Sequence, residues 1–257
     1  MIDLIIQYPF LFWKRKAKGC APTSWDELTP RQFKALARAI DGAEPDLKFI
    51  SIFTGIKEKL IGKLHPFSLL KLTESIEFVG KAGNVHSKFI IRELGSTRLT
   101  APRARLENVT FGQFIFSDAY YSGWMEKKEE KVLNNLLATL YLLPEEIFFS
   151  DSIPDRISAI EKIDLDTRKA IAFNYGLILM WLQQCYPLIF QSKNDDPDSV
   201  ETHSDASLRP NRKQSGWITL FESMVADDLI NRDRYAELPI HAVLRHLTAK
   251  YKENARR

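Results

Sequence analysis

Cysteine is scarce in this sequence, which contains only Cys20 and Cys185. A disulfide framework needs more cysteines, and these two do not have the spacing of zinc ligands. The pattern favours two reduced thiols in a cytosolic protein. We therefore expect neither a disulfide-stabilised fold nor a cysteine-based metal site.

The chain also lacks the short motifs that carry common catalytic chemistry. It contains no Gly-rich phosphate-binding loop, no Gly-x-Ser-x-Gly, no His-Glu-x-x-His and no Cys-x-x-Cys. His241 and His246 are close in sequence, but a spacing of five does not place them on one helix face as a metal pair. We predict a protein that is not an enzyme, with no catalytic residue, no metal and no cofactor. A hydrolase site assembled from distant residues is an alternative.

Neither sign of charge dominates. The 36 lysines and arginines nearly balance the 33 acidic residues, which leaves a net charge of +3. A dedicated nucleic-acid binder concentrates its positive charge on one face, whereas the basic residues here form small scattered clusters. This balance argues against nucleic acid as the main partner. The alternative function, a basic helical nucleic-acid-binding module with steeply salt-dependent binding, would use Arg103, Arg105, Arg212, Lys213, Arg256 and Arg257.

No apolar run has the features of a membrane segment. In residues 1–16 the cations follow the apolar stretch, which is the wrong order for a signal peptide. Residues 170–192 carry no formal charge and are long enough to span a bilayer. They contain Asn174, Gln183, Gln184 and Pro187, however. We interpret this stretch as a central buried helix rather than a membrane span, and expect a cytoplasmic protein without a membrane partner.

What the sequence does contain is a short phrase that occurs twice. Residues 27–33 read Glu-Leu-Thr-Pro-Arg-Gln-Phe, and residues 108–114 read Asn-Val-Thr-Phe-Gly-Gln-Phe. The Thr-x-x-Gln spacing predicts a helix start, in which the Thr hydroxyl accepts a hydrogen bond from the Gln backbone N–H and the Gln side chain reaches back to the Thr N–H. Pro30 suits the first helical position. Two explanations of the repeated phrase remain open: a duplicated unit, or two helices that begin with the same common cap.

The spacing of apolar residues predicts a mainly helical protein. Helices are expected over residues 30–40, 46–60, 66–79, 129–142 and 166–190, and two more amphipathic helices over 217–225 and from Pro239 onward. A short strand is expected at residues 2–7, and a hairpin turning at Gly95-Ser96 is expected to pair residues 88–92 with 98–106. Residues 145–163 have no clear periodicity and are expected to be irregular.

These patterns predict four parts. An N-terminal helical unit covers residues 1–95, and a second helical unit packed on it covers 96–190. Residues 191–216 have almost no apolar side chain and are expected to form a flexible linker. A C-terminal helical unit covers 217–257. The expected fold class is mainly α (α+β): a helical body with a small β-hairpin, a flexible linker and a short C-terminal two-helix unit.

Aromatic residues crowd into residues 111–124 and recur at 217–221. Core packing at the junction of two helical units is one interpretation. The other is an exposed anchor for a protein partner, because Tyr and Trp are enriched at binding hot spots. The candidate partner-binding residues are Tyr120, Tyr121, Trp124, Trp217, Phe221 and Leu244.

Several phrases, taken in order, resemble a group of tailed-bacteriophage and prophage proteins, many from phages of Bacteroidetes-type hosts. These phrases are Ser24 to Phe33, Val109 to Ile115 followed by Tyr120-Tyr121, Leu136 to Tyr141, and the apolar stretch 170–190. The group carries W-x-E-[LV]-T-x-x-Q-F, [LV]-T-x-G-x-[FL]-I and L-L-A-x-L-Y in this order. The resemblance covers about residues 22–190, and Leu142-Leu143-Pro144 stands where the group has a basic residue.

Some proteins of this group look like tail assembly chaperones, which are encoded just before the tape-measure protein. The resemblance implies a non-enzymatic assembly factor in the bacterial host cytoplasm. Its implied partners are tape-measure and tail-tube proteins, bound through apolar and aromatic anchors on the body and on the C-terminal helices.

Overall fold

The computed structural model describes residues 1–10, 13–42, 47–65, 69, 77–80, 86–190, 216–226 and 228–254. Its contacts divide the chain into two compact units. Unit 1 comprises Met1–His86 and Leu165–Asn174, and unit 2 comprises Ser87–Asp164 and Tyr175–Arg257. The four-part division expected from the sequence stays a prediction. The expected linker lies outside the described residues except for Gly216.

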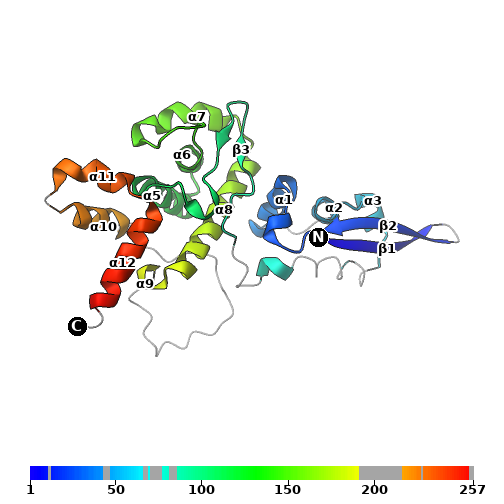
Figure 1. Cartoon of the computed structure of the whole chain (residues 1–257). Coiled ribbons are helices and arrows are strands. Elements are labelled where there is room, and N and C mark those ends of the chain that lie inside the picture. The colour runs from blue at the N-terminus through cyan, green and yellow to red at the C-terminus, as the bar shows by residue number, and fades with distance from the viewer. Residues whose placement is uncertain are drawn as a thin grey trace. The chain divides into compact units, whose positions relative to one another are not determined.

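The fold class is confirmed: the chain is mainly helical, with a small antiparallel β-hairpin (Figure 1). The elements of unit 1 are β1 (Ile2–Phe10), β2 (Trp13–Ala21), α1 (Pro30–Ile40), α2 (Leu47–Thr54), α3 (Glu58–Ile61) and the start of α8 (Leu165–Cys185). The elements of unit 2 are β3 (Glu93–Leu94), β4 (Leu99–Thr100), α5 (Phe111–Lys127), α6 (Glu130–Leu140), α7 (Ile153–Glu161), the rest of α8, α9 (Pro187–Phe190), α10 (Gly216–Val225), α11 (Arg232–Glu237) and α12 (Ile240–Asn254).

The first Thr-x-x-Gln phrase starts α1, as predicted. Thr29 Oγ1 accepts the Gln32 N–H at 3.3 Å, and Gln32 Oε1 accepts the Thr29 N–H at 3.0 Å. The Gln32 amide also donates to the Phe53 carbonyl in α2 at 2.9 Å. The next residue, Phe33, is fully buried. The phrase therefore caps one helix and joins it to the end of the following helix.

The second phrase starts α5 and makes the same connection in unit 2. Thr110 Oγ1 accepts the Gln113 N–H at 3.2 Å, and the Gln113 amide donates to the Thr139 carbonyl near the end of α6 at 2.9 Å. Phe114 is fully buried, like Phe33. Each phrase thus starts a helix whose glutamine is bonded to the last turn of the next helix.

The elements differ from the sequence prediction in several places. The strand expected at 2–7 is part of β1, but its partner β2 was not predicted, because its basic residues hide the alternation. The helix expected over 46–60 breaks at Gly55, whose φ of 72° is outside the helical region, so α2 and α3 are separate. Residues 88–92 form no strand, and the hairpin around Gly95 pairs only two residues on each side.

Another difference has the largest effect on unit 2: residues 153–161, expected to be irregular, form α7. The helix expected over 66–79 lies mostly outside the described residues. The charge-free stretch forms α8, with buried residues along its length, and Pro187 begins the separate α9. No helix in the described part of the chain is long and apolar enough to cross a membrane.

Candidate functional site

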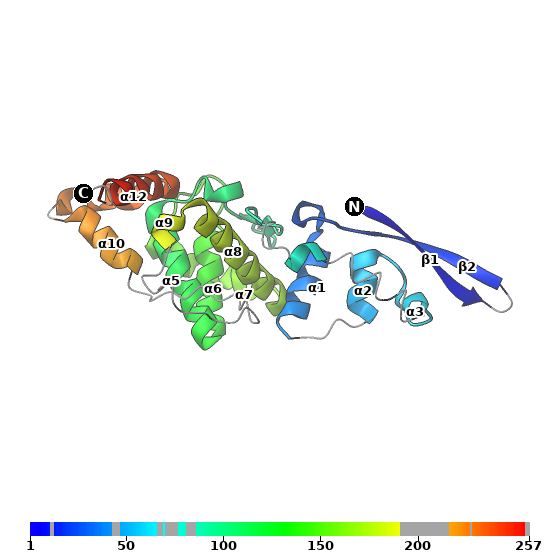
Figure 2. The ribbon, with the colours of Figure 1, turned by 90° about the horizontal axis from the view of Figure 1, so that it is seen from below.

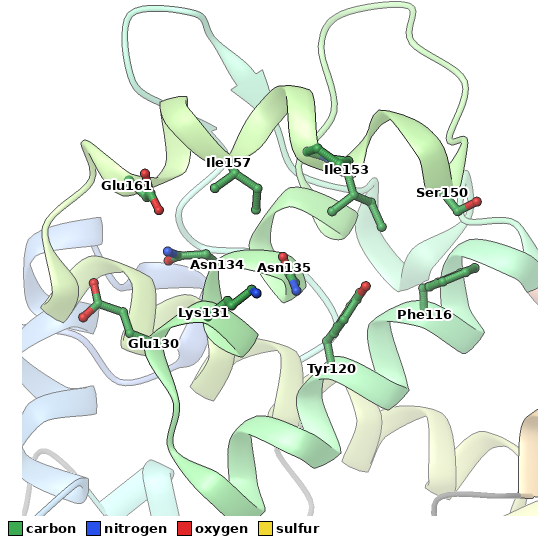
Figure 3. A pocket seen from close by; sticks show the side chains of 11 residues that line it. Phe116, Tyr120, Glu130, Lys131, Asn134, Asn135, Ser150, Ile153, Ile157 and Glu161 are labelled. Carbon is green, nitrogen blue, oxygen red and sulfur yellow. The ribbon is translucent and has the colours of Figure 1, made fainter.

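Unit 2 carries a groove between α5, α6 and α7 (Figure 3). Its volume is about 630 Å³. Phe116 and Tyr120 line it from α5, and Ile153 and Ile157 from α7. Because these side chains are aromatic or aliphatic, this end of the groove suits an apolar side chain of a ligand.

The other end of the groove is polar. Glu130, Lys131 and Asn134 project from α6, and Glu161 projects from the end of α7 (Figure 3). Glu130, Lys131 and Glu161 are exposed, whereas Asn134 is buried. Glu130 and Glu161 bring two negative charges to this end of the groove, and Lys131 brings one positive charge. The net charge of this end is therefore negative, and it would favour a basic group of a ligand.

Exposed apolar side chains also lie in the segment that contacts the groove residue Phe116. The Phe116 ring lies 6.3 Å from Tyr120 and 5.9 Å from Phe148, measured between ring centroids. Ile147 and Phe149, on either side of Phe148, are 63% and 57% exposed, and Phe116 itself is 38% exposed. We call Phe116, Ile147, Phe148 and Phe149 the apolar rim.

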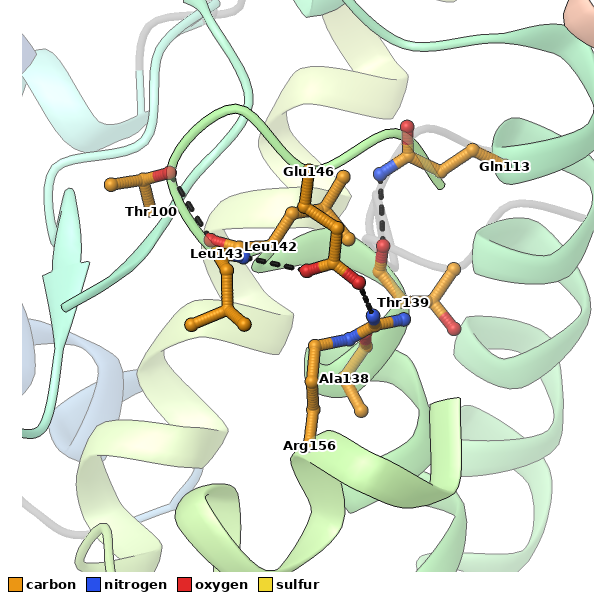
Figure 4. A network of polar contacts seen from close by, with 8 residues as sticks. All are labelled: Thr100, Gln113, Ala138, Thr139, Leu142, Leu143, Glu146 and Arg156. Carbon is orange, nitrogen blue, oxygen red and sulfur yellow. Dashed lines mark hydrogen bonds and ion pairs between the residues drawn. The ribbon is translucent and has the colours of Figure 1, made fainter. Parts of the chain in front are cut away.

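The segment that carries the apolar rim is held by a polar network (Figure 4). Arg156, in α7, donates from Nε to the Ala138 carbonyl at 2.6 Å and forms an ion pair with Glu146. The other Glu146 oxygen accepts the Leu143 N–H at 2.7 Å. Burial lowers the pKa of Arg156, and the carboxylates of Glu146 and Asp155 oppose this. The network positions the rim segment against α6 and α7.

Two further contacts fix the start of this segment. The Thr100 N–H donates to the Leu142 carbonyl at 2.7 Å, and the Leu142 N–H donates to the Thr100 carbonyl at 3.1 Å. The Thr100 hydroxyl also donates to the Leu142 carbonyl, at 3.2 Å. The hydroxyl of Tyr141 donates to the Ile91 carbonyl at 2.5 Å. Burial raises the pKa of Tyr141 well above its ordinary value of 10.0. The apolar rim is therefore an ordered part of unit 2 rather than a loose loop.

The candidate anchors chosen from the sequence lie mostly inside unit 2. Tyr121, Trp124, Phe221 and Leu244 are buried. Trp217 is half-buried, with its ring 5.1 Å from Phe114, 6.3 Å from Phe111 and 5.5 Å from Phe190. Tyr120 alone among the six lines the groove. A role for the other five in partner binding stays a prediction, and the buried ones would have to leave the core to reach a partner.

The basic residues of the alternative function are only partly described. Arg103 and Arg105 are exposed, and the other four lie outside the described residues. The Arg105 carbonyl lies 2.5 Å from His241 Nε2. Because a carbonyl can only accept, Nε2 donates in this contact, and Nδ1 lies 2.8 Å from the Tyr186 hydroxyl. His241 thus ties the start of α12 to the segment before α5.

The groove was not predicted from the sequence, because residues 145–163 were expected to be irregular. The signal that was missed is the Pro154 and Asp155 pair at the start of a run with Ile153, Ile157 and Ile160 at helical spacing. Among the described residues, no group of three or more His, Cys, Asp or Glu side chains could hold a metal ion.

Comparison with known proteins adds no relative: no protein-family model, no curated protein and no solved structure matches this chain.

Proposed function

We propose that this chain is a non-enzymatic assembly factor of the phage tail assembly chaperone type. In this proposal the groove of unit 2 and the apolar rim bind a segment of another tail protein. Tape-measure and tail-tube proteins are the proposed partners, on the strength of the sequence resemblance described above.

The observation that carries the proposal is the exposure of large apolar side chains next to one another beside a groove. Single exposed apolar residues are ordinary on a protein surface, but a contiguous group beside a concave surface is typical of interaction sites. Phe116 lines the groove and contacts Phe148, and the two sequence neighbours of Phe148, Ile147 and Phe149, are exposed. The network around Arg156 holds their segment in place, so little conformational entropy would be lost on binding.

The lining of the groove defines the kind of segment that would fit. Its apolar end would receive an aliphatic or aromatic side chain, and its acidic end, with Glu130 and Glu161, would receive a lysine or arginine. An amphipathic helix carries such residues one turn or two turns apart. A long helical tape-measure protein would present many such segments.

The first test is to identify the genes on either side of this one. A very long helical reading frame downstream and a β-rich, tube-like frame upstream are expected. Each product would then be co-expressed with this chain, and co-purification with the long helical product is expected. Metabolic or regulatory neighbours, together with no co-purification, would contradict the proposal.

The second test locates the binding surface. Ile147→Asp combined with Phe149→Asp is expected to abolish co-purification, because it places two charges on the apolar rim. The matched control is Leu229→Asp with Ile230→Asp, whose side chains are 71% and 97% exposed in another part of unit 2. If both double variants co-purify with the partner in equal amounts, the apolar rim is excluded as the docking surface.

A further inference from the structure

The hairpin of unit 1 contains the most basic of the helices and strands that the structure describes. Strand β2 carries Lys14, Arg15, Lys16 and Lys18 and contains no acidic residue. Strand β1 contains a single carboxylate, Asp3. The sequence showed Lys14 to Lys16 as one small cluster among several, but it did not show that this cluster lies on a two-stranded ribbon.

The pairing of the strands places cations on both faces of the ribbon. Lys16 pairs with Gln7 and Lys18 with Ile5, so these two lysines share one face at a spacing of about 6.6 Å along the strand. Arg15 pairs with Tyr8, on the opposite face. All three cations are exposed. Within the described residues, neither Lys16 nor Lys18 has an ion-pair partner.

The base of the hairpin is anchored to unit 1. A Cβ atom on Gly19 would lie 2.5 Å from both Ile56 Cγ1 and the Thr54 carbonyl oxygen, so only glycine allows this close approach. Ile6 is buried. Beyond this base the two strands extend past α3, as Figure 2 shows. The pairing places Arg15 and Lys16 in the half of β2 nearer the turn of the hairpin.

We propose that the β1–β2 hairpin binds double-stranded nucleic acid through its phosphate backbone. The major groove of B-DNA admits a two-stranded β-ribbon. A ribbon in that groove turns one face toward the base edges, and the phosphates line both rims of the groove, within reach of the long side chains of Lys16 and Lys18. The site lies in unit 1, is separate from the groove of unit 2, and uses none of the arginines of the alternative function above.

The test measures binding of the full chain to a fluorescein-labelled 30-base-pair DNA duplex of mixed sequence, by fluorescence anisotropy at 50 to 150 mM NaCl. Each neutralised phosphate contributes about −0.9 to the slope of log K against log salt, so three cations contribute about −2.7. A slope of this size weakens binding about 20-fold over this threefold range of salt.

The central variant is Arg15→Glu, Lys16→Glu and Lys18→Glu combined. It is expected to weaken binding at 50 mM NaCl by at least tenfold. The corresponding triple Gln variant is expected to reduce the salt slope by about 2.7. The matched control changes Lys127, Lys162 and Lys250 to Glu, three exposed lysines of unit 2, and alters the net charge equally. The control is expected to bind within about twofold of the unchanged chain.

Several outcomes would overturn the proposal. One is a loss of binding in the control as large as in the central variant, which would indicate a non-specific charge effect. Another is an unchanged affinity and salt slope in the Gln variant, with a far-UV circular dichroism spectrum like that of the unchanged chain. A third is binding to vesicles that contain phosphatidylserine without binding to the duplex. Failure of the groove experiment leaves this test unaffected, because the two surfaces share no residue.

Discussion

At the scale of the residue, Gln32 and Gln113 do more than cap helices. Each side chain leaves its own helix and donates to a backbone carbonyl near the end of the next helix, at 2.9 Å in both cases. The last carbonyls of a helix have no partner within the helix and must find one elsewhere. Both glutamines are buried, so water cannot replace the missing donor easily.

Replacing Gln113 with methionine is therefore expected to destabilise the protein by about 1 to 3 kcal/mol. Methionine keeps the length of the side chain but leaves the Thr139 carbonyl without its donor. The free energy of unfolding would be measured by urea denaturation monitored by circular dichroism. Gln7→Met, at an exposed position of β1, is the control and should change stability by less than about 0.5 kcal/mol. Similar values for the two variants would show that the Gln113 bond contributes little.

At the scale of the element, the segment between α6 and α7 shows how tertiary contacts order a region with weak local signals. Tyr141 ends α6 and bonds the Ile91 carbonyl, while Arg156 and Glu146 close the other side of the segment. Three parts of the chain, around residues 91, 141 and 156, thus meet in one place. None of these pairs is close in sequence, so no local pattern could predict them.

The pH dependence of stability tests the Tyr141 contact. Burial holds the pKa of this phenol well above its ordinary value of 10.0, so the folded protein keeps a proton that the unfolded chain releases near pH 10. The contribution of protonated Tyr141 to the free energy of unfolding is therefore complete below pH 10. It is lost as the pH rises through the pKa of Tyr141 in the folded protein. At pH 7, Tyr141→Phe is expected to be less stable by about 1 kcal/mol, because the hydrogen bond to Ile91 is lost.

Above pH 10 the stability difference between the unchanged chain and Tyr141→Phe is expected to narrow. The measurement is the free energy of unfolding in urea at several pH values from 7 to 11. Tyr251→Phe, at a residue that is 54% exposed, is the control and should show no such trend. A gap that stays constant across this range would mean that the Tyr141 hydroxyl is accessible to solvent.

At the scale of the whole molecule, the two proposed surfaces belong to different compact units. The groove and the apolar rim lie in unit 2, and the basic hairpin lies in unit 1. Within unit 2, the C-terminal helices are part of the core: Ile240, Val243 and Leu244 are buried, and Gly112 on α5 lies close to Ala236 on α11. The resemblance implied that these helices carry anchors for a partner; in the structure they pack against α5, and a role in partner binding stays a prediction.

A substitution at Trp217 tests whether this residue packs in the core of unit 2 or binds a partner. Trp217→Ala is expected to cost about 3 kcal/mol of stability, because the ring packs against Phe111 and Phe114. Ile218→Ala, at a neighbouring position that is 49% exposed, should cost under about 1 kcal/mol. Thermal unfolding would measure both. Full stability of Trp217→Ala, together with lost co-purification of a partner, would instead identify Trp217 as an anchor.

Much of the helical fold was predictable because its signals are local. These signals act within a few residues. They are the caps at Thr29 and Thr110, the apolar spacing of α1 and α6, and the helix stops at Gly42 and Pro144. The hairpin was half predicted: β1 has an apolar run, whereas β2 is basic and is defined only by its pairing with β1. Helix α7 was missed because its apolar residues are few and it follows an irregular segment.

The sequence by itself determined that the chain is mainly helical, because hydrogen bonds within helices, caps and periodic apolar residues depend on neighbours along the chain. Only the tertiary structure decided which large apolar side chains face solvent. Tyr121 and Trp124 are buried although each carries a polar group, while the wholly apolar side chains of Ile147 and Phe149 are exposed. Burial depends on what other segments cover a side chain, and those segments are distant in sequence. For the same reason, both proposed binding surfaces could be located only once the chain was folded.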